Sequence, residues 1–230
     1  MKKIMFNDRY GLTQAVLEGK KTMTRRIIPD IEIDWVRRGR VTLPVGGFEN
    51  DTLFMDVRSI LRDAGISDYP APAKYQPRYE RGEELAVAQC YKDIDYRGIV
   101  AFEDASDIQP GMVRPIPAQE SAGWTNKMFV RADLMEETIR ITDIQLQRLN
   151  NITDEDCLKE GVQKWIDCYI VTGIMENRRK NNFCFNSPRE AFACLIDKIF
   201  GKGTWESNPF VFVYEFKLVR KKEVWRSIEL

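Results

Sequence analysis

The sequence predicts an α+β fold, and three stretches of the chain carry that prediction. Residues 188–200 place apolar side chains at helical spacing. Ser187, Pro188 and Glu190 are residues typical of a helix start. Residues 137–146 alternate as a half-buried strand does, and residues 210–219 form an almost continuous apolar run typical of a central strand. With 230 residues, 43% of them hydrophobic, we expect one elaborated domain over residues 1–230.

The first elements expected are a strand at residues 3–6 and a helix over residues 8–18. Gly19 stands where a left-handed residue ends a helix, so the chain turns there. Because side chains alternate along an extended segment, the next residues divide between two faces, with Thr22, Thr24 and Arg26 on one face and Lys21, Met23 and Arg25 on the other.

Two long stretches read as insertions. Residues 30–78 mix short strand-like pieces with turns and an extended proline segment. Residues 92–125 are rich in Asp, Gly, Pro, Ser and Gln, which is typical of either a surface excursion or a cover over a site. Trp124, near the end of the second insertion, is either a stacking platform for a base or an ordinary packing residue.

The remaining elements follow from local signals. Residues 84–91 and 127–131 read as strands. Residues 163–165 and 167–175 could be helix or strand, and residues 176–182 read as a polar, basic loop. Thr153 followed by Asp156 resembles a capping pair, and Gly161 is placed as a C-terminal stop, which predicts a helix of about two turns between them. Glu160 then falls at the negative end of that helix, where a carboxylate is poorly placed unless a cation or a function holds it.

Composition excludes several classes of function. Thirty-five basic residues balance 35 acidic ones, so nucleic acid could be bound only by a local cluster, such as residues 1–30 with seven basic and three acidic side chains. The chain has no histidine, which leaves Lys, Glu or Asp as general base and removes His-ligated metal sites. We expect neither metal nor cofactor.

Cysteine usage and hydropathy bear on the compartment. Five cysteines without a C-x-x-C pair argue against a disulfide framework and favour reduced thiols in a cytoplasm. No segment reads as a signal peptide or a membrane span, so no membrane partner is expected.

Gly19, Lys21 and Arg26 resemble the G-x-K-x-x-E-x-R signature of the ASCH family, a branch of the PUA-like β-barrels. Thr24 stands where many members have Glu, which breaks the general signature. Lys21 followed by Thr24 instead resembles the small ASCH amidohydrolases that cleave N4-acetylcytidine. The passage L-x-x-I-T-x-E-D-x-x-x-E-G at residues 149–161 and W-x-x-N-P-F-V-F-V-Y-x-F at residues 205–216 are similar to the helix and closing strand of longer, often phage-associated ASCH proteins.

The resemblance implies a PUA-like/ASCH mixed β-barrel with flanking helices and the two insertions. It implies RNA or a modified nucleoside as ligand, at a cationic pocket on the Gly19–Arg26 motif. Its candidate binding residues are Gly19, Lys20, Thr22, Arg25, Arg26 and Trp124.

Two alternatives to a binding protein stay open. One is an amidohydrolase acting on an N4-acylated cytidine, with Lys21, Thr24 and Glu160 as catalytic residues; crowding by neighbouring cations and partial burial would lower the pKa of Lys21 toward that of a base. The other is a protein-interaction module. The plainer interpretations are a solvated basic turn and an exposed helix-end carboxylate.

Overall fold

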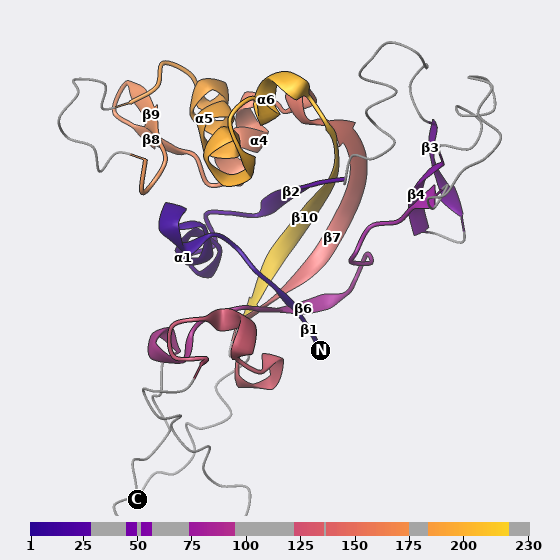
Figure 1. Ribbon diagram of the computed structural model, residues 1–230, viewed down its shortest axis with the longest axis vertical. Coiled ribbons are helices and arrows are strands. Elements are labelled where there is room, and N and C mark those ends of the chain that lie inside the picture. Colours follow the sequence, from indigo (N-terminus) through magenta and orange to yellow (C-terminus); the bar gives the residue numbers. More distant parts are fainter. Residues whose placement is uncertain are drawn as a thin grey trace, which may run out of the picture. The chain divides into compact units, whose positions relative to one another are not determined.

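A computed structural model describes residues 1–28, 45–49, 52–56, 74–94, 122–135, 137–174 and 184–220 (Figure 1). Most of the two predicted insertions, at residues 30–78 and 92–125, lies outside the described residues. The elements in chain order are β1 (Lys2–Ile4), η1 (Asp8–Tyr10), α1 (Leu12–Leu17), β2 (Met23–Ile27), β3 (Val45–Glu49), β4 (Thr52–Asp56), β5 (Lys74–Tyr75), β6 (Glu84–Val87), η2 (Tyr91–Asp93), η4 (Lys127–Phe129), η5 (Ala132–Leu134), β7 (Glu137–Arg148), η6 (Leu149–Asn151), α4 (Asp154–Lys159), β8 (Gln163–Trp165), β9 (Cys168–Ile170), α5 (Pro188–Phe200), α6 (Thr204–Ser207) and β10 (Phe210–Arg220).

The main sheet is mixed and has the strand order β1-β6-β7-β10-β2. β1 runs parallel to β6, whereas β10 pairs with β2 in antiparallel register, with Tyr214 opposite Thr24. Smaller sheets join β3-β4-β5 and β8-β9. The α+β class is therefore confirmed. Among the described residues the main sheet does not close on itself, so the barrel stays a prediction.

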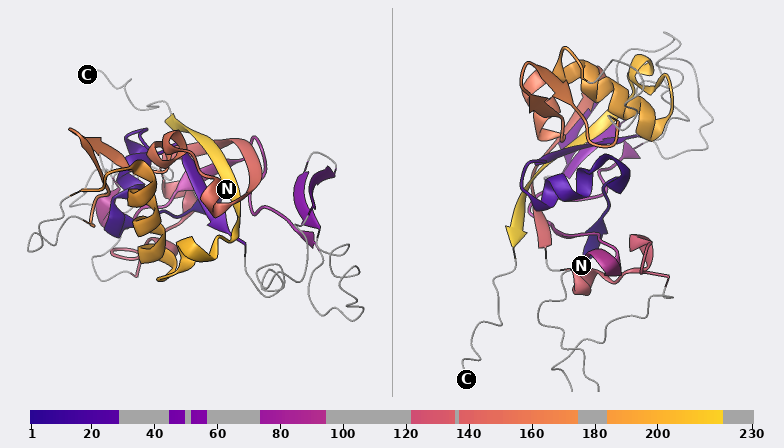
Figure 2. Two further views of the ribbon diagram at one scale, coloured as in Figure 1. Left: turned by 90° about the horizontal axis from the view of Figure 1, so that it is seen from above. Right: turned by 90° about the vertical axis from the view of Figure 1, so that its left-hand side faces the viewer.

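The chain divides into two compact units. Met1–Phe6, Glu84–Ile139 and Val219–Leu230 form unit 1, and Asn7–Glu83 and Arg140–Leu218 form unit 2. Unit 1 has a small core of Ala86, Ile94, Val130 and Met135. In unit 2, helices α4, α5 and α6 lie side by side at one end of β10 (Figures 1 and 2).

The predicted first helix is interrupted near its start. Residues 8–10 form the 3-10 turn η1, and Gly11 at φ 64° separates it from α1. The side chain of Asn7 accepts a hydrogen bond from the Arg9 amide, which caps this short 3-10 turn at the predicted start of the helix. Gly19 is left-handed at φ 73°, as predicted.

The two predicted helix caps are present. The Thr153 hydroxyl accepts a hydrogen bond from the Asp156 amide at the start of α4, at 3.1 Å, and Gly161 follows the helix at φ 105°. The Ser187 hydroxyl accepts from the Glu190 amide at 3.2 Å, at the start of α5. The strand predictions at residues 137–146 and 210–219 are likewise confirmed by β7 and β10.

The strand predicted at residues 127–131 is wrong. These residues begin with the 3-10 helix η4, because the Asn126 side chain accepts a hydrogen bond from the Met128 amide and so competes with strand pairing. No helix of the described residues is long and apolar enough to cross a membrane.

The prediction that all cysteines are reduced is also wrong, because the structure contains a disulfide between Cys168 and Cys184. Their Cα atoms are 5.7 Å apart although 16 residues separate them in sequence. The pairing of Tyr169 with Phe185 brings them together, and this contact between distant segments leaves no local signal. Cys90, Cys157 and Cys194 form no disulfide.

A thiol count in denaturant tests the disulfide. Protein purified without reductant should expose three reactive thiols, those of Cys90, Cys157 and Cys194, and five after reduction. The Cys168→Ser variant should expose four before reduction, because the loss of Cys168 frees Cys184. Five thiols in the untreated wild-type protein would contradict the disulfide.

Candidate functional site

The turn between α1 and β2 draws Lys21 into the protein. The amides of Lys20 and Lys21 both donate to the carbonyl of Ala15, at 2.8 and 2.9 Å, and the left-handed Gly19 allows this tight reversal. The Thr22 amide then donates to the carbonyl of Lys159 at 2.9 Å, which ties the turn to the end of α4. Only 2% of Lys21 is exposed, so it is no solvated basic turn residue.

Glu160 is the buried partner of Lys21. The Nζ of Lys21 donates to Glu160 Oε2 at 2.6 Å and to the Glu160 backbone carbonyl at 2.7 Å. Only 4% of Glu160 is exposed. The contact explains how a carboxylate is tolerated at the negative end of α4, because an ammonium group neutralises both the side chain and a terminal carbonyl.

Arg25 on β2 extends this pair into a four-residue network. Its guanidinium donates to Glu160 Oε1 at 3.2 Å and to Asp156 Oδ2 at 2.9 Å. Asp156 and Glu160 lie four residues apart, on one face of α4. We call Lys21, Arg25, Asp156 and Glu160 the buried ion network; it holds two cations and two carboxylates, and within the described part of the chain the Arg25 Nε has no hydrogen-bond partner.

Burial sets the protonation chemistry of the network. Desolvation lowers the pKa of Lys21 below 10.5, the nearby cations Arg26 and Arg25 act in the same direction, and Glu160 opposes the shift. Burial also raises the pKa of Cys157, on α4, to about 12. That thiol stays protonated near neutral pH and is therefore no nucleophile.

Thr24 does not join the Lys21–Glu160 pair. Neighbouring side chains on a strand point to opposite faces, so Thr24 lies on the face of β2 opposite to Arg25. No hydrogen bond connects the Thr24 hydroxyl with Lys21 or Glu160, all three of which are described residues. Its cross-strand neighbour is Tyr214, whose hydroxyl accepts a hydrogen bond from the Arg78 amide at 2.9 Å.

The other predicted ligand-binding residues differ in their surroundings. Gly19 shapes the turn, and Lys20 is exposed and pairs with Glu18 at 2.6 Å. Thr22 bridges two segments through its backbone, because its carbonyl also accepts from the Phe216 amide at 2.9 Å. Arg26 is half-buried on β2, opposite Phe212.

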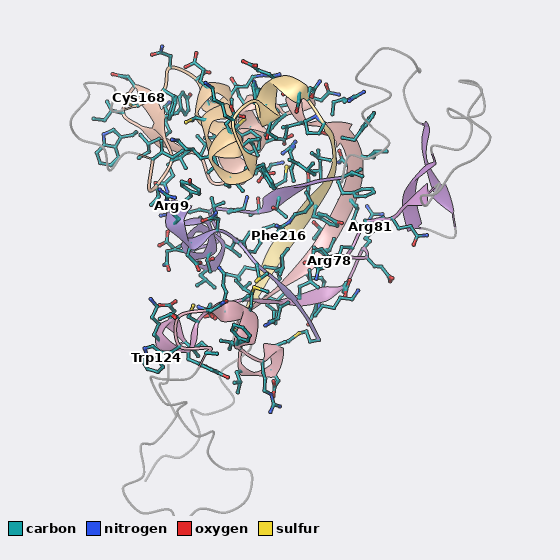
Figure 3. The ribbon with its side chains drawn as sticks, viewed as in Figure 1. Arg9, Arg78, Arg81, Trp124, Cys168 and Phe216 are labelled. Carbon is teal, nitrogen blue, oxygen red and sulfur yellow. A yellow bond between two sulfur atoms is a disulfide. The ribbon has the colours of Figure 1, made fainter. Side chains whose placement is uncertain are left out.

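Trp124 belongs to unit 1, whereas the buried ion network belongs to unit 2. It is half-buried in a turn next to the 3-10 helices of unit 1 (Figure 3). Its role as a stacking residue stays a prediction.

Asp156 is the site residue that sequence reasoning missed. The sequence predicts for Asp156 only a role in the Thr153 cap. The available signal was its spacing from Glu160, because two carboxylates four residues apart on one helix face repel each other and a cation between them relieves the repulsion. Among the described residues no three Cys, Asp or Glu side chains cluster as metal ligands.

Comparisons with protein-family models, with curated proteins and with solved structures found no match to this chain. The ASCH resemblance therefore stands on the motifs alone.

Replacing Glu160 by Gln should reduce the free energy of unfolding by about 3–5 kcal/mol, because it leaves Lys21 and Arg25 buried without their shared carboxylate. The matched control is Glu18→Gln, which breaks an exposed pair of the same 2.6 Å length and should change stability little. Urea titrations of the two variants provide the comparison. Equal losses would show that burial does not set the strength of the Lys21–Glu160 pair.

The lowered pKa of Lys21 predicts a pH dependence with a definite sign. Between that lowered pKa and 10.5 the unfolded chain binds more protons at Lys21 than the folded chain does, so folding becomes more favourable as pH rises. The stability of the wild-type protein relative to Lys21→Met should therefore increase with alkaline pH in this window. Other groups that titrate at alkaline pH, such as Tyr214, are present in both proteins, so their contributions to the stability difference cancel. A difference that stays constant with pH would refute the shift.

Proposed function

We propose that this chain is an ASCH-type protein that binds a modified nucleoside at the Lys21–Glu160 pair. The observation that carries the proposal is the 2.6 Å contact between a buried ammonium and a buried carboxylate. A donor and an acceptor held side by side away from water match the edge of a base, which also presents a donor beside an acceptor. Buried polar groups discriminate strongly against ligands that leave them unpaired.

The charge of the network favours a neutral group over a phosphate as the ligand of the Lys21–Glu160 pair. The two buried cations of the motif, Lys21 and Arg25, already contact Glu160, whose carboxylate would repel a phosphate placed beside it. An amide or a base edge suits the site better, because its N–H can donate to Glu160 while its carbonyl accepts from Lys21. The ligand class thus narrows from RNA in general to a base or nucleoside.

The family resemblance supports this class from a separate direction. Gly19, Lys21 and Arg26 match the ASCH signature, and the Thr153–Gly161 passage supplies a helix of the expected kind that ends at Glu160. The PUA-like barrel belongs to the same proposal, and the mixed five-stranded sheet supports it.

Amide hydrolysis is the second candidate, and the lowered pKa of Lys21 favours it. With the ammonium proton passed to Glu160 Oε2, 2.6 Å away, Lys21 becomes a neutral amine and Glu160 a carboxylic acid. Lys21 then takes a proton from water as its oxygen attacks the acyl carbonyl. The C–N bond breaks while Glu160 protonates the departing base nitrogen, giving a carboxylic acid and the free base.

Water is the better nucleophile than Thr24 in this scheme. The Thr24 hydroxyl makes no hydrogen bond to Lys21, the only nearby base that the scheme provides. Thr24 instead lies on the opposite face of β2, with Tyr214 as its cross-strand neighbour.

Incubation with N4-acetylcytidine tests both candidates. Lys21→Met should abolish cytidine release and weaken nucleoside binding, because it removes the base and the carbonyl donor together. Lys20→Met, which removes an exposed neighbouring cation, should leave both unchanged. Both variants should first be shown to fold, by circular dichroism and urea titration.

The outcomes separate the two candidates. Binding that depends on Lys21 without turnover would establish recognition and exclude hydrolysis of this substrate. Binding that survives Lys21→Met, or that falls steeply with salt as phosphate contacts do, would contradict the proposed site.

A further inference from the structure

The β8–β9 hairpin begins three residues after Glu160, so the chain that carries the site carboxylate runs directly into it. β8 pairs with β9 in antiparallel register, with Trp165 opposite Cys168, and only Ile166 and Asp167 form the turn. β9 contacts α5, and Cys168 marks the hairpin in Figure 3. Five residues of extended chain span at most about 18 Å, which bounds the separation of the Cα atoms of Glu160 and Trp165.

Outside β3, β4 and β5, the two most exposed large apolar side chains of the described part of unit 2 lie at the tip of this hairpin. Trp165 is 58% exposed and Ile166 77%, compared with 44% for Phe200 and 38% for Leu158. Ile166 also has a φ of 53°, a conformation that is costly for a β-branched residue and that glycine would adopt freely. The hairpin therefore keeps two apolar side chains at its tip where folding alone favours a small or polar turn.

The hairpin is also held rigidly behind its tip. The Cys168–Cys184 disulfide joins the residue after the turn to the segment before α5, and the backbones of Tyr169 and Phe185 exchange hydrogen bonds of 2.9 and 2.8 Å. An aromatic side chain on a rigid support loses little conformational freedom when it binds a partner.

We propose that Trp165 is a stacking platform for a nucleobase that flanks the nucleoside held by Lys21 and Glu160, so that the natural ligand is a single-stranded RNA that contains the modified base. The proposal rests on the function proposed above and adds a second contact for the same ligand. A nucleobase fits this position because an indole face stacks on any base.

The test compares two probes, free N4-acetylcytidine and a short single-stranded RNA with one N4-acetylcytidine at its centre. Wild-type protein should bind the RNA more tightly than the nucleoside. Trp165→Ala should weaken RNA binding about tenfold, while Trp165→Phe should restore most of it. Neither variant should change binding of the free nucleoside, because Trp165 contacts only the flanking base. The matched control is Phe129→Ala, which removes a 62% exposed aromatic from unit 1 and should have no effect.

Three results would overturn the stacking role. The first is RNA binding no tighter than nucleoside binding, and the second is RNA binding that Trp165→Ala leaves unchanged. The third is self-association of the wild-type protein that Trp165→Ala abolishes, which would identify a second copy of the chain as the partner of the tip. After any of these results, the proposed nucleoside site still holds if Lys21→Met removes binding of the free nucleoside. A failure of the nucleoside site itself would instead affect the binding of both probes.

Discussion

The buried salt bridge between Lys21 and Glu160 is the interaction on which the arrangement of unit 2 depends. Removing both charged groups from water costs several kcal/mol each, and their mutual attraction offsets this only when the geometry is close and other polar atoms are satisfied. Here the α1–β2 turn delivers Lys21, the end of α4 delivers Glu160, and Arg25 and Asp156 satisfy further oxygen and nitrogen atoms. The contact of α4 with the α1–β2 turn and with β2 is thus specified by charge as well as by apolar packing.

The same arrangement limits what the site can bind. A cationic motif in a sequence suggests phosphate recognition, yet the two motif cations that the structure buries are already neutralised by carboxylates. Such a network suits a ligand that brings its own donor and acceptor and little net charge. The exposed cations and aromatic side chains that could contact a nucleic-acid backbone lie elsewhere, and Lys164 and Trp165 on β8 are examples.

Several features of the fold were predictable because they depend on neighbours in the sequence. The Thr153 and Ser187 caps, the left-handed Gly19 and the alternating or apolar strands β7 and β10 all follow from spacings of four residues or fewer. The failures have equally physical causes. A 3-10 helix capped by the Asn126 side chain stands where a strand was expected at residues 127–131. The Cys168–Cys184 disulfide depends on a pairing of segments 16 residues apart.

The sequence by itself singled out two groups of the candidate site: Lys21 after a glycine stop, and Glu160 at the end of a capped helix. Only the tertiary structure decided that Lys21 and Glu160, 139 positions apart in the sequence, form a 2.6 Å contact. It also decided that Arg25 and Asp156 complete the network and that Thr24 lies on the other face of β2. The reason is that capping and side-chain alternation are set by adjacent residues, whereas burial and charge pairing depend on which distant segments pack together.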